Sequence, residues 1–208
     1  MVAKDFAYFS AALILACLNS GCERVHIDRF ARRFAGSSDQ HALDDYAMTE
    51  PNLTGHAFMA RAIQLSLENV QSGRGGPFGC VVVEAGKIVA EGVNQVTAMN
   101  DPTAHAEVLA IRQACQKLRC FELRGCDLYT SCEPCPMCLG AIYWARIHKV
   151  YFGNLAEDAA KIGFNDSAIY KELARPRAQR EIPMVPMMRD EALAAFRAWA
   201  EKPGKIPY

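Results

Sequence analysis

The sequence lacks an excess of charge of either sign. Lysine and arginine together number 23, aspartate and glutamate also number 23, and the formal net charge is zero. A protein that holds a long polyanion through its overall field carries a basic excess, because each phosphate contact adds affinity by releasing counterions. The balance argues against a large nucleic-acid substrate, and we expect no nucleic acid among the partners.

A membrane-spanning stretch is also missing. The apolar run at residues 6–18 is too short to cross a bilayer comfortably, since a spanning helix needs about 20 apolar residues. Lys4 followed by Asp5 makes a poor basic start for a signal peptide. The nine cysteines are odd in number and unevenly placed, which argues against a disulfide framework. We therefore expect no membrane partner and a cytoplasmic protein.

Internal repeats and low-complexity segments are absent too, but residues 1–47 differ in character from the rest. Three interpretations of this N-terminal extension stay open: an appended segment preceding a start at Met48, a targeting segment, or a structural helix. We expect residues 48–208 to form one domain, because about 160 residues can bury an ample core.

Helix and strand patterns alternate along this domain. Met59, Ile63, Leu67 and Val70 recur at helical spacing and predict the buried face of a helix over 54–71. Strands are predicted at 78–83, 88–93, 126–130 and 149–153, with an edge strand at 184–187. Further helices are predicted from a cap at Asp101 or Thr103, at about 134–145, 157–162, 167–173 and 190–201. The order predicts a three-layer α/β/α fold around a central mixed sheet.

The chemical centre combines two motifs, T-A-H-A-E at 103–107 and P-C-P-M-C at 134–138. His105, Cys135 and Cys138 supply one nitrogen and two thiolates, three ligands that leave a fourth zinc position open for water. Glu107 lies close enough in sequence to move protons to and from that water without binding the metal. H-x-E followed by P-C-x-x-C is the signature of zinc nucleobase deaminases.

Cys132 leaves an alternative open. With Cys135 and Cys138 it reads C-x-x-C-x-x-C, but the next ligand of an iron–sulfur motif falls on Ile142. Cys132 as a fourth ligand would instead close a structural zinc site in a zinc-stabilised interaction protein without enzymatic activity. That arrangement gives Glu107 no role, so we interpret Cys132 as a small buried side chain.

The sequence resembles the cytidine deaminase superfamily, and within it the bacterial guanine deaminases, from about Phe58 to Tyr208. The motifs that carry the resemblance are G-G-P-F-G at 75–79, N-D-P-T-A-H-A-E at 100–107, the run Y-T-S-C-E-P-C-P-M-C-L-G-A-I-Y-W-A-R at 129–146, G-F-N-D-S at 163–167 and the terminal tyrosine. The resemblance implies a cytidine-deaminase-like fold and hydrolysis of guanine to xanthine and ammonia in purine metabolism. It also implies one zinc per subunit, held by His105, Cys135 and Cys138, with Glu107 as the proton shuttle.

The same resemblance implies the substrate contacts. Phe78 and Trp144 would lie against the purine, Asn94 would bond its polar edge, and Tyr208 would help to close the pocket. For Asn94, a strand-end amide that bonds a base edge and a turn-forming asparagine are both open. Asp166 could accept from the N1–H and the amine of guanine together, or cap the helix from Ser167.

The family pattern further implies a homodimer in which the C-terminal segment can be exchanged between subunits. In the exchanged form, Asp166 and Tyr208 would serve the partner's site. Asn165 stands where the pattern has a second acidic residue beside Asp166.

Two other activities share the zinc motif. A tRNA adenosine deaminase extrudes a base from an RNA loop, and it needs a basic face that the acidic residues of the C-terminal region do not favour. Deamination of another small amino-heterocycle or nucleoside depends on the shape of the pocket, which sequence does not show.

Overall fold

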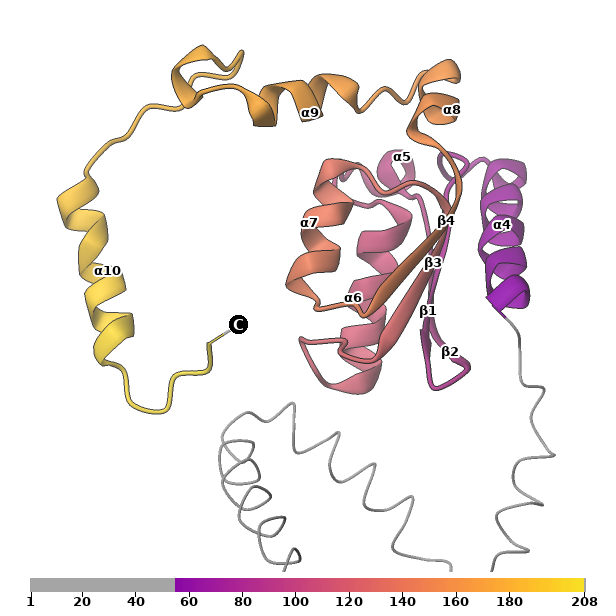
Figure 1. Ribbon diagram of the computed structural model, residues 1–208, viewed down its shortest axis with the longest axis horizontal. Coiled ribbons are helices and arrows are strands. Elements are labelled where there is room, and N and C mark those ends of the chain that lie inside the picture. The colour runs from indigo at the N-terminus through magenta and orange to yellow at the C-terminus, as the bar shows by residue number, and fades with distance from the viewer. Residues whose placement is uncertain (1–54, 208) are drawn as a thin grey trace, which may run out of the picture. The chain divides into compact units, whose positions relative to one another are not determined.

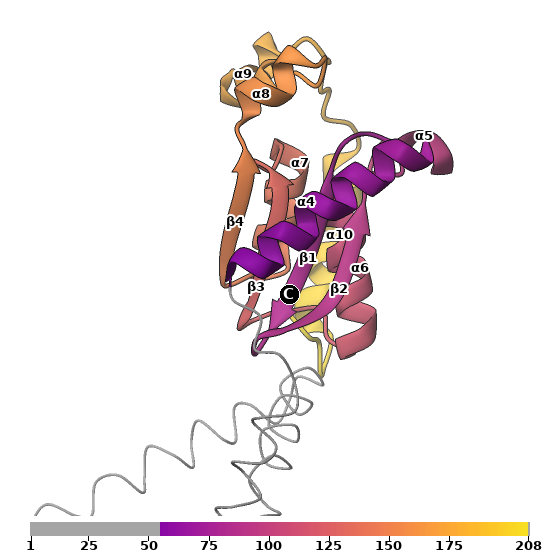
Figure 2. The same cartoon turned by 90° about the vertical axis from the view of Figure 1, so that its right-hand side faces the viewer.

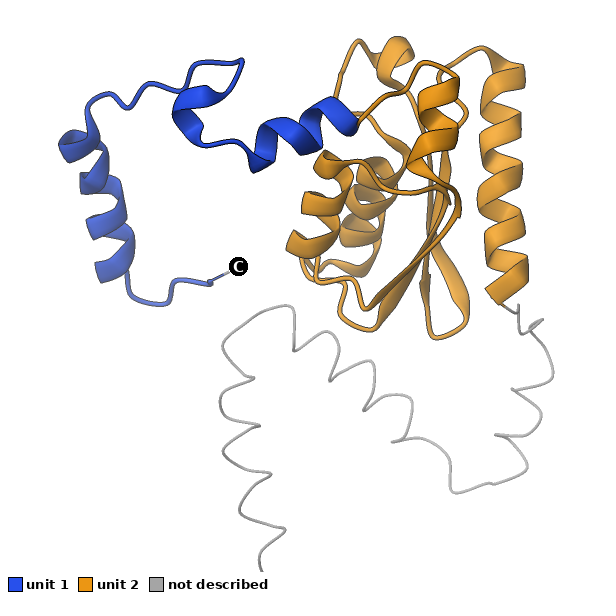
Figure 3. Cartoon of the chain, turned by 45° about the horizontal axis from the view of Figure 1, so that its top comes forward, with its two compact units in different colours: residues 1–24, 167–208 blue, residues 25–166 orange. Residues whose placement is uncertain are grey.

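The computed structural model describes residues 55–207 (Figure 1). The described chain falls into two compact units, one ending at Asp166 and the other beginning at Ser167 (Figure 3). The predictions for residues 1–47, and the place of Tyr208, lie outside the described residues. Among residues 55–207, no helix combines the length and apolar character that a bilayer crossing requires.

A four-stranded mixed sheet forms the centre of the first unit. Its strands are β1 (Gly79–Glu84), β2 (Lys87–Val93), β3 (Cys126–Cys132) and β4 (Lys149–Asn154), in the order β2-β1-β3-β4. Strand β1 runs antiparallel to both neighbours, with Val82 opposite Ala90 and Leu128, whereas β3 and β4 are parallel. Every residue of β1 except Glu84 is buried, as expected for a strand covered on both faces.

Helices cover both faces of this sheet. Helix α4 (Gly55–Ser72) lies on one face, and α6 (Ala106–Leu118) and α7 (Pro136–Trp144) lie on the other (Figures 1 and 2). One core cluster joins the sheet to α6 and α7 and includes Val82, Ala110, Leu128 and Ile142. A second joins it to α4 and includes Phe58, Leu65, Val81 and Tyr129. The predicted three-layer α/β/α fold is confirmed.

The predicted buried face of α4 is wrong at three of its four residues, and only Met59 packs against the core. Ile63, Leu67 and Val70 are 42%, 58% and 51% exposed. The helix instead buries Phe58, Ala62, Leu65, Ser66 and Asn69. The reason is close packing, because a Cβ on Gly79 of β1 would lie 2.4 Å from the carbonyl oxygen of Ala62. Small and polar residues therefore form much of the buried face, which apolar spacing alone cannot reveal.

The other predicted elements are confirmed with small shifts, except at the C-terminal end. Helix α8 is Ala156–Lys161, α9 is Ser167–Ala174 and α10 is Arg189–Glu201; two short elements were not predicted, helix α5 (Val96–Met99) and the 3-10 turn η1 (Arg177–Gln179). No strand forms at 184–187, and residues 167–207 contain no strand with which it could pair. An isolated strand is not stable without a partner.

Candidate active site

His105 lies at the start of helix α6. The helix begins at Ala106, and His105 is its N-cap residue in an extended conformation. The caps predicted at Asp101 or Thr103 are therefore wrong. The Asp101 carboxylate instead accepts from the amide and hydroxyl of Thr103, at 2.8 and 2.7 Å, and forms a local turn before the helix. The predicted placement of His105 and Glu107 at a helix N-terminus is confirmed.

The two cysteines lie at the start of helix α7. Cys135 is its N-cap, Pro136 follows at the first helical position, and the Cys138 amide donates to the Cys135 sulfur at 3.5 Å. Free N–H groups and the positive end of the helix dipole favour a thiolate over a thiol. Two helix starts therefore meet at one place, as the motif spacing predicts.

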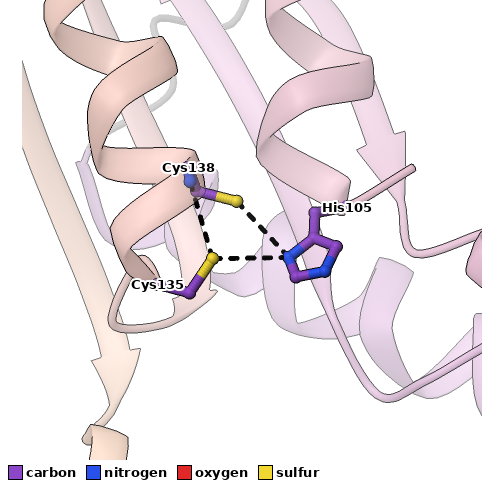
Figure 4. Close-up of side chains that lie close together, drawn as sticks. All are labelled: His105, Cys135 and Cys138. Atoms are coloured by element: carbon purple, nitrogen blue, oxygen red, sulfur yellow. Dashed lines mark hydrogen bonds between the residues drawn. The ribbon is translucent and has the colours of Figure 1, made fainter. Parts of the chain in front are cut away.

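His105, Cys135 and Cys138 are arranged as metal ligands (Figure 4). His105 Nδ1 lies 3.6 Å from Cys135 Sγ and 3.5 Å from Cys138 Sγ. In a tetrahedral zinc site, bonds of about 2.3 Å to sulfur and about 2.0 Å to nitrogen place N and S about 3.5 Å apart. The donor set and its spacing fit zinc, with one coordination position left open.

Cys135 and Cys138 shift each other's pKa in opposite directions. Hydrogen bonding from Cys138 and His105 lowers the pKa of Cys135 to about 4, despite its burial. The same pairing with Cys135, together with burial, raises the pKa of Cys138. Hydrogen bonding to Cys135 also raises the pKa of His105. Binding of a cation displaces the ligand protons, so metal affinity falls as the pH falls.

Glu107 is buried beside the ligands in the first turn of α6. One carboxylate oxygen, Oε1, accepts from the Thr130 hydroxyl at 3.0 Å, and Oε2 lies 3.4 Å from the Cys138 sulfur. Burial raises the pKa of the Glu107 carboxyl above its ordinary value. A carboxyl whose pKa is shifted toward neutrality is suited to accept a proton and then to return it.

Thr130 gives a first prediction. Thr130→Val keeps the shape of this fully buried side chain but removes the only hydroxyl that orients Glu107 within the described residues. We expect kcat to fall about tenfold, because a hydrogen bond to a charged group contributes about 1.5 kcal/mol or more. Metal content should not change. Thr130→Ser keeps the hydroxyl and serves as the control, and equal kcat values for the two variants contradict the role.

A cavity of about 420 Å³ opens beside the ligand group, within the size range of small-molecule sites. The predicted site residues that line it are Phe78, Asn94, His105, Glu107, Cys135 and Asp166. Trp144 is not among the lining residues; it ends helix α7 and is 64% exposed. The structure thus brings six predicted residues to one cavity and leaves Trp144 outside it.

The turn-forming role of Asn94 is confirmed, and bonding to the edge of a base stays a prediction. Its side-chain Oδ1 accepts from the amides of Gly76 and Val96, at 3.2 and 3.4 Å, which is the turn-forming role. These bonds use the carbonyl side of the amide and leave the Nδ2 donors for a ligand in the cavity.

Asp166 also lines the cavity. Burial raises the pKa of the Asp166 carboxyl, and the negative charge of Cys135 adds to this upward shift.

Cys132 lines the cavity without joining the ligand group. Its sulfur lies 3.7 Å from the Leu155 carbonyl oxygen, and burial raises its pKa to about 11. Within residues 55–207, the group able to hold a metal is His105, Cys135 and Cys138. The geometry supports the interpretation of Cys132 as a small buried side chain.

Sequence reasoning missed two residues of this site. Phe164 lines the cavity and meets Phe78 edge to face, with ring centroids 4.9 Å apart. Its only sequence signal is its place two residues before Asp166. Thr130 had no signal, because its bond to Glu107 joins residues 23 positions apart.

The chain is similar in sequence to known deaminases. Residues 54–154 match the family model described as the cytidine and deoxycytidylate deaminase zinc-binding region. The chain is 54% identical to the guanine deaminase of Bacillus subtilis over 151 residues, 73% of this chain and 97% of that protein. It is 47% identical to the tRNA-specific adenosine deaminase of Aquifex aeolicus over 38% of this chain and 52% of that protein.

Solved structures of guanine deaminases are similar to this chain as well. The crystal structure of the Bacillus subtilis guanine deaminase superposes with a TM-score of 0.73 at 52% identity, covering 75% of this chain and 99% of that one. A guanine deaminase from Nitrosomonas europaea superposes with a TM-score of 0.54 at 31% identity, covering 72% of this chain and 87% of that one.

Proposed function

Because the chain belongs to the cytidine and deoxycytidylate deaminase family, we propose that it hydrolyses guanine to xanthine and ammonia with the aid of zinc. The observation that carries the proposal is the similarity to a guanine deaminase over nearly the whole length of that enzyme. A cavity of suitable size beside the His105, Cys135 and Cys138 group adds to it. The tRNA-specific relatives match only about half of their own length.

Each site residue has a separate role in the proposed reaction. The chemistry that zinc supplies when bound is activation of a water molecule as the nucleophile. Glu107 would move both protons of the attacking water, one to ring nitrogen N3 as the water oxygen bonds to C2, and the other to the amino nitrogen, whose bond to C2 then breaks to release ammonia. The water oxygen remains on that carbon. Asp166 accepts from the N1–H and the amine of guanine, and the Asn94 Nδ2 donates to its polar edge.

A substrate panel tests this proposal. Ammonia release is measured on guanine, guanosine, adenine, cytosine, ammeline and a tRNA anticodon stem. We expect the highest kcat/KM on guanine, since adenine lacks the N1–H and amine donor pair that a carboxylate can bind. Turnover only on the RNA stem contradicts the substrate and leaves the zinc chemistry intact. No turnover on any member, with zinc bound, favours the non-enzymatic alternative.

Asp166 gives a second prediction. Asp166→Asn replaces the acceptor pair by an amide whose N–H groups face the donors of guanine. We expect KM for guanine to rise about 100-fold, because two hydrogen bonds to a charged group contribute about 3 kcal/mol together. Asp190→Asn, at a side chain that is 92% exposed, is the charge-matched control. An unchanged KM in Asp166→Asn contradicts the role in substrate recognition.

We also propose a homodimer with an exchanged C-terminal segment. Helices α9 and α10 bury no residue, although Ile169, Leu173, Phe196 and Trp199 lie along them. Amphipathic helices are stable when their apolar faces pack against another surface. Helix α7 likewise exposes Tyr143 and Trp144. Sedimentation equilibrium measures the oligomeric state directly, and a chain that remains monomeric at micromolar concentration contradicts the proposed homodimer.

Contacts of Trp144 and Tyr208 with the purine stay predictions.

The N-terminal extension gives a third prediction. We propose that the deaminase domain begins near Met48 and that residues 1–47 are dispensable for catalysis. We also propose that the protein is cytoplasmic. The family match begins at residue 54 and the site residues follow it. A chain starting at Met48 should keep kcat and KM for guanine within about a factor of two, and its thermal unfolding midpoint should change little. Loss of folding on truncation would show that the extension is structural.

A further inference from the structure

Asn69 is a buried polar residue that the reaction does not use. It lies on the sheet-facing side of helix α4 and is 1% exposed. Its side-chain Nδ2 donates to two backbone carbonyl oxygens, those of Gly76 and Asn94, each at 2.8 Å. One side chain thus holds together two segments 18 residues apart in sequence.

The two segments are the walls of the cavity. Gly76 belongs to the glycine-rich loop between α4 and β1, Asn94 directly follows β2, and both line the cavity. They approach so closely that a Cβ on Gly75 would lie 2.1 Å from the Asn94 carbonyl oxygen. The Gly76 amide in turn donates to Asn94 Oδ1. Any shift of the Asn94 backbone therefore also moves its side-chain amide.

A primary amide fits this place because it carries two donors on one nitrogen, one for each carbonyl. The other half of the same amide shows a cost. Asn69 Oδ1 is buried and has no hydrogen-bond partner among the described residues. A buried acceptor without a partner destabilises the fold by about 1–3 kcal/mol. Departures of this kind from the best-packed solution concentrate at functional sites.

We propose that Asn69 is a positioning residue for purine binding. By fixing the carbonyls of Gly76 and Asn94, it sets the direction in which the Asn94 Nδ2 donors face the ligand. The inference rests on the proposed function, since a purine is the ligand that Asn94 meets. Asn69 is not among the residues that line this cavity, so its effect passes through Asn94.

A double-mutant cycle tests this path. Asn69→Leu removes both donors at similar volume, and Asn94→Ala removes the side-chain amide whose direction they are proposed to set. In the wild-type background, we expect Asn69→Leu to raise KM for guanine about tenfold and to change kcat less than threefold. In the Asn94→Ala background, we expect it to raise KM by less than twofold. An equal KM rise in both backgrounds, or no rise in either, overturns the proposal.

Structural damage alone gives a different result. Ser66→Ala, on the same buried face one turn earlier, removes a hydroxyl bonded to the carbonyl of Ile63 in its own helix, and it should leave KM unchanged. If Asn69→Leu does not fold, Asn69→Ser provides one donor and a smaller KM rise in the same cycle. Calorimetric binding of 8-azaguanine to the zinc-loaded protein repeats the cycle without turnover. It therefore still decides the role of Asn69 if guanine is not hydrolysed.

Discussion

Replacement of Glu107 by glutamine is expected to leave zinc bound and to lower kcat for guanine by about 10³-fold. Glutamine has the size of glutamate, and its amide oxygen can still accept from the Thr130 hydroxyl, so the buried position stays filled. It cannot take up a proton. Without a proton carrier, the water is not activated efficiently and the leaving nitrogen is not protonated. The measurements are kcat by ammonia release and zinc content of the same preparation.

A matched control uses an exposed carboxylate outside the cavity lining. Glu157→Gln, at an exposed position of helix α8, makes the same chemical change and should leave kcat unchanged. Near-normal turnover in Glu107→Gln would rule out the mechanism. Loss of zinc together with turnover would identify Glu107 as a ligand. The non-enzymatic alternative, with Cys132 as a fourth ligand, expects no functional effect from this substitution.

The ligand group could be predicted from sequence because its signal is local. His105 caps one helix, Cys135 caps another, and Cys138 follows one turn later. Helix starts are marked by short sequence patterns, and a three-residue spacing places two side chains on one face. The strands were predictable for a similar reason, since each is a short β-branched or apolar run bounded by turn residues.

The buried face of α4 could not be predicted in this way. The apolar spacing of Ile63, Leu67 and Val70 was real, but these residues point away from the sheet. The packing is decided by Gly79 on a different element, which lets the helix approach closely only through small residues. The close contact between α4 and β1 decides which face of the helix is buried, and the sequence of neither element alone shows this contact.

The residues that support the site were hidden for the same reason. Thr130 acts on Glu107, Asn69 on Asn94, and Phe164 on Phe78, and each pair joins separate segments. Nothing in the local pattern of a threonine in a strand or an asparagine in a helix predicts such a partner. Sequence therefore indicated the groups that carry the chemistry, and the structure adds the groups that hold them in position.

Replacement of His105 by alanine is expected to abolish both zinc binding and turnover. The two thiols that remain cannot complete a site whose three ligand atoms lie within 4.8 Å of one another. Zinc content should fall from about one per chain to below about 0.1 after dialysis against a mild chelator. A metal whose free concentration is 100 times its Kd stabilises the folded state by about 2.7 kcal/mol. Because His105→Ala loses this stabilisation, its thermal unfolding midpoint should also fall.

The response to a chelator separates this cause from simple packing loss. In the wild type, a strong chelator should lower the unfolding midpoint, because binding free energy contributes to folding. In His105→Ala it should have no further effect. His148→Ala, at a side chain that is 68% exposed and paired with Asp127, is the matched control and should keep zinc and turnover. A His105→Ala protein that retains zinc and hydrolyses guanine would contradict the assignment of the ligand group, and with it the role of Glu107 beside it.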